Sequence, residues 1–280
     1  SVADPRDRDS DPDDTAGGHG THVAGTTGAV GNNGVGVAGV SWDVRLMAVK
    51  IFGDDLVLAT TADSVDGIEY AVDNGADVIN ASWGGGGEST AIRDAIEAAG
   101  QAGVVFVAAA GNNGTDNDIT PFYPASYDLD NIISVMATDR NDERSGFSNY
   151  GAESVDIAAP GSEILSCQAG GGYLQLQGTS MASPHVAGAA ALMLSSDPNL
   201  TVEQLKDILL MTVDKTLEGL NASEGRMNLE QAILNTVIDT IAPTPNPAEW
   251  NVEPQVTGLE TIYMEAVAAS DERGGPVEYY

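Results

Sequence analysis

The fold is organised around Gly178-Thr179-Ser180-Met181-Ala182-Ser183-Pro184-His185-Val186-Ala187-Gly188, which runs on into the apolar segment Ala189–Leu194. Small and apolar residues of this kind form helices readily, and a helix that is apolar on every side must be buried. Ser180 would then lie at the N-terminus of that helix, where backbone N–H groups and the helix dipole favour developing negative charge. The stretch therefore predicts a buried helix whose serine is either a nucleophile or a helix cap, the commoner role at such a position.

Two further stretches favour the nucleophile. A serine hydroxyl needs a base such as an imidazole to take its proton. Far upstream of Ser180 the chain reads Gly18-His19-Gly20-Thr21-His22-Val23-Ala24-Gly25-Thr26, and between the two lies Ala109-Ala110-Gly111-Asn112. In content and in order, the three blocks resemble the subtilisin-like serine peptidases (subtilases).

The resemblance implies a role for each matched residue. It makes His19 the general base, Ser180 the nucleophile and Asn112 the oxyanion-hole amide, acting beside the backbone N–H of Ser180. His22 and His185 also lie inside the matched blocks, where the family uses the corresponding histidines for packing.

The family's third catalytic residue is an aspartate that precedes the histidine, at the end of a buried strand, and is followed by Ser or Thr and then Gly. Residues 1–18 read SVADPRDRDSDPDDTAGG, an acidic loop without an apolar run, whose aspartates we expect to be solvated. We therefore expect the triad aspartate upstream of Ser1, in a longer precursor, unless the lineage has lost it. Without that carboxylate the chain by itself should be severely impaired.

The composition and charge of the chain limit the kinds of partner that it can bind. The chain has 42 acidic and 11 basic side chains, a net charge of −31, which argues against binding nucleic acid or anionic membranes. Such an excess favours solubility in salty water, calcium binding or both, although most of these carboxylates would simply be solvated. Cys167 is the only cysteine, so an internal disulfide is impossible. No apolar run is long enough to cross a bilayer. The resemblance implies an extracellular, monomeric protein that acts on proteins or peptides.

Apolar strands alternate with amphipathic helices along the chain. We predict strands over 44–52, 77–82, 104–110, 131–138 and 155–159, and helices over 61–74, 90–102, about 202–212 and 229–237. This order predicts an α/β fold with a mostly parallel central sheet, right-handed crossovers and flanking helices.

The strand over 77–82 ends in Trp83-Gly84-Gly85-Gly86-Gly87, where glycines would leave the backbone bare for another chain. In the subtilases this edge lines the specificity pocket and pairs with substrate as an added strand. The resemblance thus makes Ser82, Trp83 and Gly84 substrate-binding, with Trp83 either narrowing the pocket or packing against a helix. The opposite wall would come from Ala109, Ala110 and Gly111, and the lack of a basic residue there suggests apolar or aromatic P1 side chains.

Gly31-Asn32-Asn33-Gly34 is a strong turn signal. It resembles the family's calcium loop, in which backbone carbonyls and one Asn side chain bind the ion. The resemblance makes Val30, Asn33, Val35 and Val37 the candidate ligands of a structural calcium ion, and an ordinary turn is the alternative.

The composition changes near Asp239. We predict a peptidase domain over 1–238 that lacks its N-terminal strand, and a Pro-rich linker over 239–250. Strand-like segments over 261–268 and 277–280 suggest that residues 251–280 begin a small β-sandwich module that they cannot complete.

The function that the resemblance implies is that of a secreted serine endopeptidase working through an acyl-enzyme on Ser180. One alternative is a catalytically impaired pseudopeptidase that binds protein or polymer in the same cleft. Another is an esterase that uses the same nucleophile.

Overall fold

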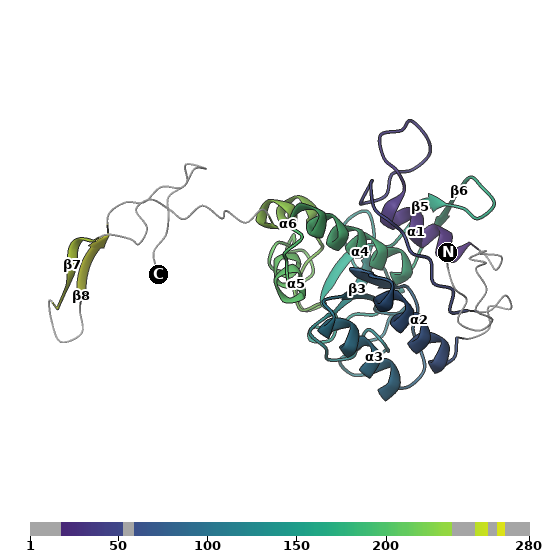
Figure 1. Cartoon of the computed structure of the whole chain (residues 1–280), viewed down its shortest axis with the longest axis horizontal. Coiled ribbons are helices and arrows are strands. Elements are labelled where there is room, and N and C mark those ends of the chain that lie inside the picture. Colours follow the sequence, from purple (N-terminus) through teal and green to yellow (C-terminus); the bar gives the residue numbers. More distant parts are fainter. Residues whose placement is uncertain (1–17, 53–58, 237–249, 257–261, 267–280) are drawn as a thin grey trace. The chain divides into compact units, whose positions relative to one another are not determined.

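A computed structural model describes residues 18–52, 59–236, 250–256 and 262–266 of the chain (Figure 1). The chain divides into two compact units, Ser1–Thr236 and Val237–Tyr280.

A four-stranded parallel sheet forms the centre of the first unit, in the order β1 (Val78–Ala81), β2 (Val105–Ala109), β3 (Ile132–Thr138), β4 (Ile157–Pro160). Every residue of β2 and β3 is buried, because helices cover both faces of a parallel sheet. Strands built mainly from apolar residues, such as Ile132–Thr138, are therefore typical of this architecture. The predicted α/β fold with a mostly parallel sheet is confirmed.

The described residues of this unit form six helices: α1 (His19–Gly28), α2 (Thr61–Asp73), α3 (Thr90–Gln101), α4 (Thr179–Ser196), α5 (Val202–Met211) and α6 (Leu229–Thr236). Capping residues in the sequence mark the N-terminus of two of these helices. Thr60 and Asp63 form a capping box at α2, as Thr201 and Gln204 do at α5. The four predicted helices over 61–74, 90–102, 202–212 and 229–237 agree with α2, α3, α5 and α6 to within a residue or two.

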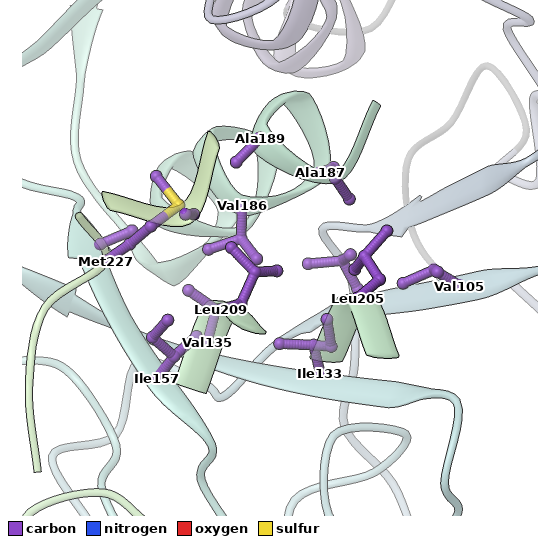
Figure 2. Packing of buried hydrophobic residues seen from close by; sticks show 14 of the residues in the cluster. Val105, Ile133, Val135, Ile157, Val186, Ala187, Ala189, Leu205, Leu209 and Met227 are labelled. Atoms are coloured by element: carbon purple, nitrogen blue, oxygen red, sulfur yellow. The ribbon is translucent and has the colours of Figure 1, made fainter. Parts of the chain in front are cut away.

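Helix α4 is the central helix of the unit and contacts all four strands. Its residues Val186, Ala187 and Ala189 pack into one buried cluster with strand residues and with α5 (Figure 2). The strand and α5 side chains of that cluster include Val105, Ile133, Val135, Ile157, Leu205 and Leu209. This packing confirms the prediction that the helix following Ser180 is buried.

The predicted strand over 44–52 is wrong. None of these residues lies in a strand, and Leu46 and Met47 are 50% and 39% exposed. A strand needs a hydrogen-bonded neighbour as well as an apolar run, and this segment has none among the strands that the structure describes. Val44 and Leu46 instead lie against Gly28 at the end of α1.

An antiparallel hairpin of β5 (Ile164–Cys167) and β6 (Tyr173–Leu176) was not predicted. Both strands have four residues, too short to show a clear period. The signal that would have revealed it is the run Gly170-Gly171-Gly172 between two apolar segments, since all three glycines have positive φ.

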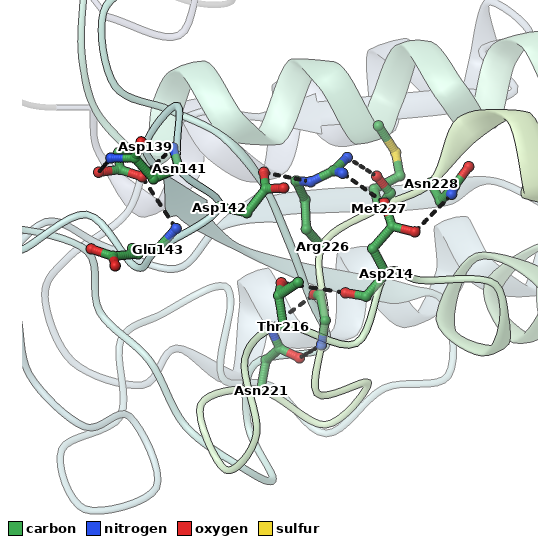
Figure 3. Close-up of polar contacts among 11 residues, drawn as sticks. Asp139, Asn141, Asp142, Glu143, Asp214, Thr216, Asn221, Arg226, Met227 and Asn228 are labelled. Carbon is green, nitrogen blue, oxygen red and sulfur yellow. Dashed lines mark hydrogen bonds and ion pairs between the residues drawn. The ribbon is translucent and has the colours of Figure 1, made fainter.

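The segment after α5 returns to the edge of the sheet and is fixed there by Arg226 (Figure 3). Its Nε lies 2.7 Å from an Asp142 oxygen, its Nη2 donates to Asp214 at 2.6 Å, and its Nη1 donates to the Met227 carbonyl. Asn228 donates to the other oxygen of Asp214 at 2.8 Å. One guanidinium thus joins three segments of the chain.

In the second unit, β7 (Trp250–Val256) pairs with β8 (Ile262–Ala266) as an antiparallel hairpin. β8 lies inside the strand predicted over 261–268, whereas β7 was not predicted. Residues 239–249 of the predicted linker and the predicted strand over 277–280 lie outside the described residues. The peptidase domain, the linker and the β-sandwich module remain predictions.

Candidate active site

Ser180 is the second residue of α4, which follows Gly178 as its N-cap. Its Oγ donates to the Ser82 carbonyl at 3.2 Å, and the Ser82 Oγ donates to the Ser180 carbonyl at 2.8 Å. Ser180 is therefore not the cap of α4, which was the structural alternative to a nucleophile. Its side chain is half-buried between β1 and the helix terminus and can be reached from solvent.

Asn112 is held beside the start of α4 by its own side chain. Its Oδ1 accepts the Thr179 N–H at 2.8 Å and the Thr179 Oγ1 hydroxyl at 3.0 Å. These two bonds orient the amide so that Nδ2, the group that can donate to an oxyanion, turns away from Thr179. Asn112 itself is exposed, and its Nδ2 lies 3.6 Å from the position of a Cβ built on Gly178, the N-cap of α4.

His19 is the first residue of α1, and its side chain is exposed. Helix α1 packs against α4, and a Cβ on Gly188 would lie 3.0 Å from the carbonyl of Thr27 in α1. The helix that begins at His19 and the helix that carries Ser180 are therefore in contact.

The other two histidines have structural contacts. His22 is fully buried, and its Nε2 lies 3.0 Å from the carbonyls of Ile164 and Leu174, which ties α1 to the β5–β6 hairpin. The Nδ1 of His185 lies 2.8 Å from the Met181 carbonyl within α4. These contacts agree with the packing role that the sequence predicts for both.

We expect His185 to make the fold sensitive to acid. Burial lowers the pKa of His185 below its ordinary value of 6.5, and the neighbouring His22 acts in the same direction. A lowered pKa contributes stability above pH 6.5 that is lost as the pH falls from there through the folded-state pKa, because unfolding then takes up a proton. The melting temperature should therefore fall less steeply between about pH 7 and pH 5 in His185→Asn than in the parent. Parallel curves for the two proteins would contradict this assignment.

The segment after β1, which is predicted to bind substrate, has open space around only some of its glycines. A Cβ built on Gly85, Gly86 or Gly87 would meet no atom within 4 Å, whereas one on Gly84 would lie 2.4 Å from the Phe122 ring. Gly84 is therefore packed against Phe122, and the N–H of Gly85 donates to the neighbouring Tyr123 carbonyl at 2.8 Å. Trp83 is half-buried and packs on the cluster around Phe106. This cluster therefore covers much of the Trp83 surface.

The residues predicted to form the opposite wall lie at the end of β2. Ala109 and Ala110 are 3% and 0% exposed, and the side chain of Ala110 packs in a cluster with Met136 and Val155. The Ala110 N–H and carbonyl bond to Val135 and Asn117. The turn at Gly111, with φ of 110°, directs the chain from there to Asn112.

The candidate calcium loop is a surface turn. Asn33 Oδ1 accepts the Val35 N–H at 2.9 Å, and Val30 and Val35 are more than half exposed. Within the described ranges, no group of three or more His, Cys, Asp or Glu side chains is arranged to hold a metal ion. The candidate ligands, three backbone carbonyls and one amide oxygen, are the neutral oxygen donors that calcium accepts.

A cavity of about 460 Å³ opens beside Arg226. The charged side chains that line it pair with one another: Arg226 with Asp142, and Arg140 with Glu163. In the part of the chain that the structure describes, no helix has both the length and the apolarity to cross a membrane.

Comparison with known proteins points to the same family as the three sequence blocks. Residues 2–228 match the model of the Subtilase family, Peptidase_S8. The chain is 45% identical over 216 residues to subtilisin DY of Bacillus licheniformis, covering 77% of each sequence. It is 41% identical over 228 residues to thermitase of Thermoactinomyces vulgaris, covering 81% of this chain and 78% of thermitase. A solved cold-adapted subtilisin-like serine proteinase superposes with a TM-score of 0.69 at 37% identity, covering 81% of this chain and 79% of that one.

Proposed function

Since this chain belongs to the subtilase family of serine peptidases, we propose that it hydrolyses peptide bonds through an ester on Ser180, with His19 as general base and then general acid. The observation that supports this most is the arrangement at the start of α4. There the half-buried Ser180 lies next to an Asn112 amide whose orientation is fixed by Thr179.

In the proposed reaction His19 removes the Ser180 hydroxyl proton as Oγ attacks the substrate carbonyl. The negative charge that develops on the carbonyl oxygen is stabilised by Asn112 Nδ2 and by the backbone N–H of Ser180, one of the first-turn donors that lack an intrahelical acceptor. His19 then gives its proton to the leaving amine, and water hydrolyses the ester by the reverse sequence. The family pattern implies that an aspartate orients His19.

The substrate would be an unfolded protein or a peptide that lies along the segment after β1. Gly85–Gly87 leave room for an extended chain, and main-chain hydrogen bonds to such an edge bind substrate with little regard to its sequence. We propose Ser82, Trp83 and Gly84 on one side and Ala109, Ala110 and Gly111 on the other as the walls of the P1 pocket. We further propose that the protein acts outside the cell as a monomer.

This function can be separated from its alternatives by one comparison. The complete parent protein is assayed with an unfolded protein and with a peptide and an ester of the same acyl sequence. Turnover of the protein and the peptide supports an endopeptidase, and turnover of the ester alone supports an esterase. Binding without turnover supports the pseudopeptidase.

We also propose that Val30, Asn33, Val35 and Val37 bind a structural calcium ion, three through carbonyl oxygens and Asn33 through Oδ1. A bound ion would order a surface turn that has a left-handed residue at Asn32. A ligand that binds only the folded state raises stability with its concentration, by about 2.7 kcal/mol at 100 times its Kd.

The test of this site is the melting temperature with calcium and with a chelator. We expect calcium to stabilise the parent and to have a much smaller effect on Asn33→Ala. Asn74→Ala is the matched control, since Asn74 also lies in an exposed turn before a glycine. An equal calcium response in Asn33→Ala would place the ion elsewhere.

A further inference from the structure

We infer that Asn117 and Asn149 are positioning residues, which hold the turn that presents the Asn112 amide to the reacting carbonyl. The inference rests on the proposed function, because it assigns to this pair the support of the proposed oxyanion donor. Both side chains are 1% exposed, although asparagine is usually a surface residue. Two buried amides next to a catalytic turn call for a structural reason.

Asn149 holds the chain just after Asn112. Its Oδ1 accepts the backbone N–H of Asn113 at 2.8 Å and that of Thr115 at 3.3 Å. Its own backbone N–H donates to the Gly111 carbonyl at 2.9 Å. A single residue therefore bonds to the main chain on both sides of Asn112.

Asn117 completes the network on the side of the sheet. It accepts from Asn149 Nδ2 at 3.0 Å and donates its own Nδ2 to the Ala110 carbonyl at 2.9 Å. Ala110 follows the last residue of β2 directly. The pair thus links the end of the strand to the far side of the turn, so that residues 110–115 are fixed at both ends.

Close packing gives the network little room to relax. Gly111 has φ of 110°, and a Cβ there would lie 2.4 Å from Asn149 Nδ2. The two amides are in contact with the turn itself and not merely near it. Neither side-chain amide is left without a hydrogen-bond partner, and a satisfied buried network of this kind is rigid.

The network is anchored in turn to the central sheet. Ser148 Oγ donates to the Asn149 carbonyl and accepts the N–H of Ala137, a residue of β3, both at 2.8 Å. The Arg144 guanidinium lies over the Tyr150 ring, 4.7 Å from its centroid. Asn112 is therefore held from two directions: Thr179 orients its side chain, and the Asn117–Asn149 pair positions its backbone through β3.

The test is the kinetics of Asn117→Ala in the complete parent protein. Removal of this amide leaves Asn149 Nδ2 and the Ala110 carbonyl buried without partners, which should loosen the turn. We expect kcat for a peptide substrate to fall by about 10-fold with KM changed by less than about 2-fold, because the oxyanion exists only in the transition state. Asn117→Asp, which keeps the acceptor for Asn149, takes its place if Asn117→Ala does not fold.

Asn131→Ala is the matched control. Asn131 is also a buried asparagine, and its Nδ2 donates to the Ile96 and Val104 carbonyls, at the opposite end of β2. The control should lose comparable thermal stability but keep its kcat within about 2-fold. An equal loss of kcat in both variants would show a general effect of destabilisation and would overturn the inference.

A double-mutant cycle shows whether Asn117 acts through Asn112. If it does, Asn117→Ala should lower kcat by less than about 2-fold in an Asn112→Ala background. A full 10-fold loss in that background would overturn the positioning role. The proposed function fails separately, if hydrolysis by the parent does not depend on Ser180.

Discussion

Replacing Ser180 with alanine is expected to abolish peptide hydrolysis by the complete parent protein, with kcat lowered by about 10⁶-fold, as for loss of the catalytic serine in subtilisin. The substitution removes the only atom proposed to form a covalent bond with substrate, while the hydrogen bond from Ser82 to the Ser180 carbonyl can remain. Folding should therefore be preserved, and the variant should still bind peptides. The measurement is the single-turnover rate with an unfolded protein and a short chromogenic peptide.

Ser196→Ala is the matched control for this substitution. Ser196 ends the same helix, is exposed, and donates only within α4, to the Leu192 carbonyl. It should leave kcat and KM unchanged. Unaltered hydrolysis in Ser180→Ala would show that the nucleophile is another group and would rule out the acyl-enzyme.

The second large effect is expected at Asn112. Asn112→Ala should lower kcat by about 10²–10³-fold with little change in KM, because the amide donates to an oxygen that is negatively charged only in the transition state. The loss removes one donor and leaves the Ser180 N–H in place, so a residual rate should remain. Steady-state kinetics with one peptide substrate give both constants.

Asn113→Ala controls for loss of an amide from the same turn. Asn113 is exposed, and the network holds it through its backbone N–H, which alanine keeps. We expect kcat within about 2-fold of the parent. A rise in KM with unchanged kcat in Asn112→Ala would mean that Asn112 binds ground-state substrate and does not stabilise the oxyanion.

The sequence was sufficient for the elements whose pattern is local. The mainly apolar strand β3 and the buried helix after Ser180 both follow from residues close together in the chain. The three blocks that suggested the family also located the helix terminus that carries Ser180. These features hold because short-range propensity and burial favour the same structure.

The features that were missed depend on contacts far apart in the chain. An apolar run cannot show whether a strand will find a neighbour, which is why the segment over 44–52 was assigned to the sheet. Gly84 packs against Phe122, and Asn149 reaches Asn117 across 32 residues. No local pattern distinguishes an asparagine in such a network from one in an ordinary loop.

The most direct measurement of the central claim is the reaction of the complete parent protein with an organofluorophosphonate, followed by peptide mapping by mass spectrometry. Such reagents form a stable bond with an activated serine hydroxyl. We predict one adduct, on Ser180, which a peptide substrate slows and which His19→Ala forms far more slowly. Loss of hydrolytic activity with the adduct on another residue, or persistent hydrolysis with Ser180 fully labelled, would contradict the assignment.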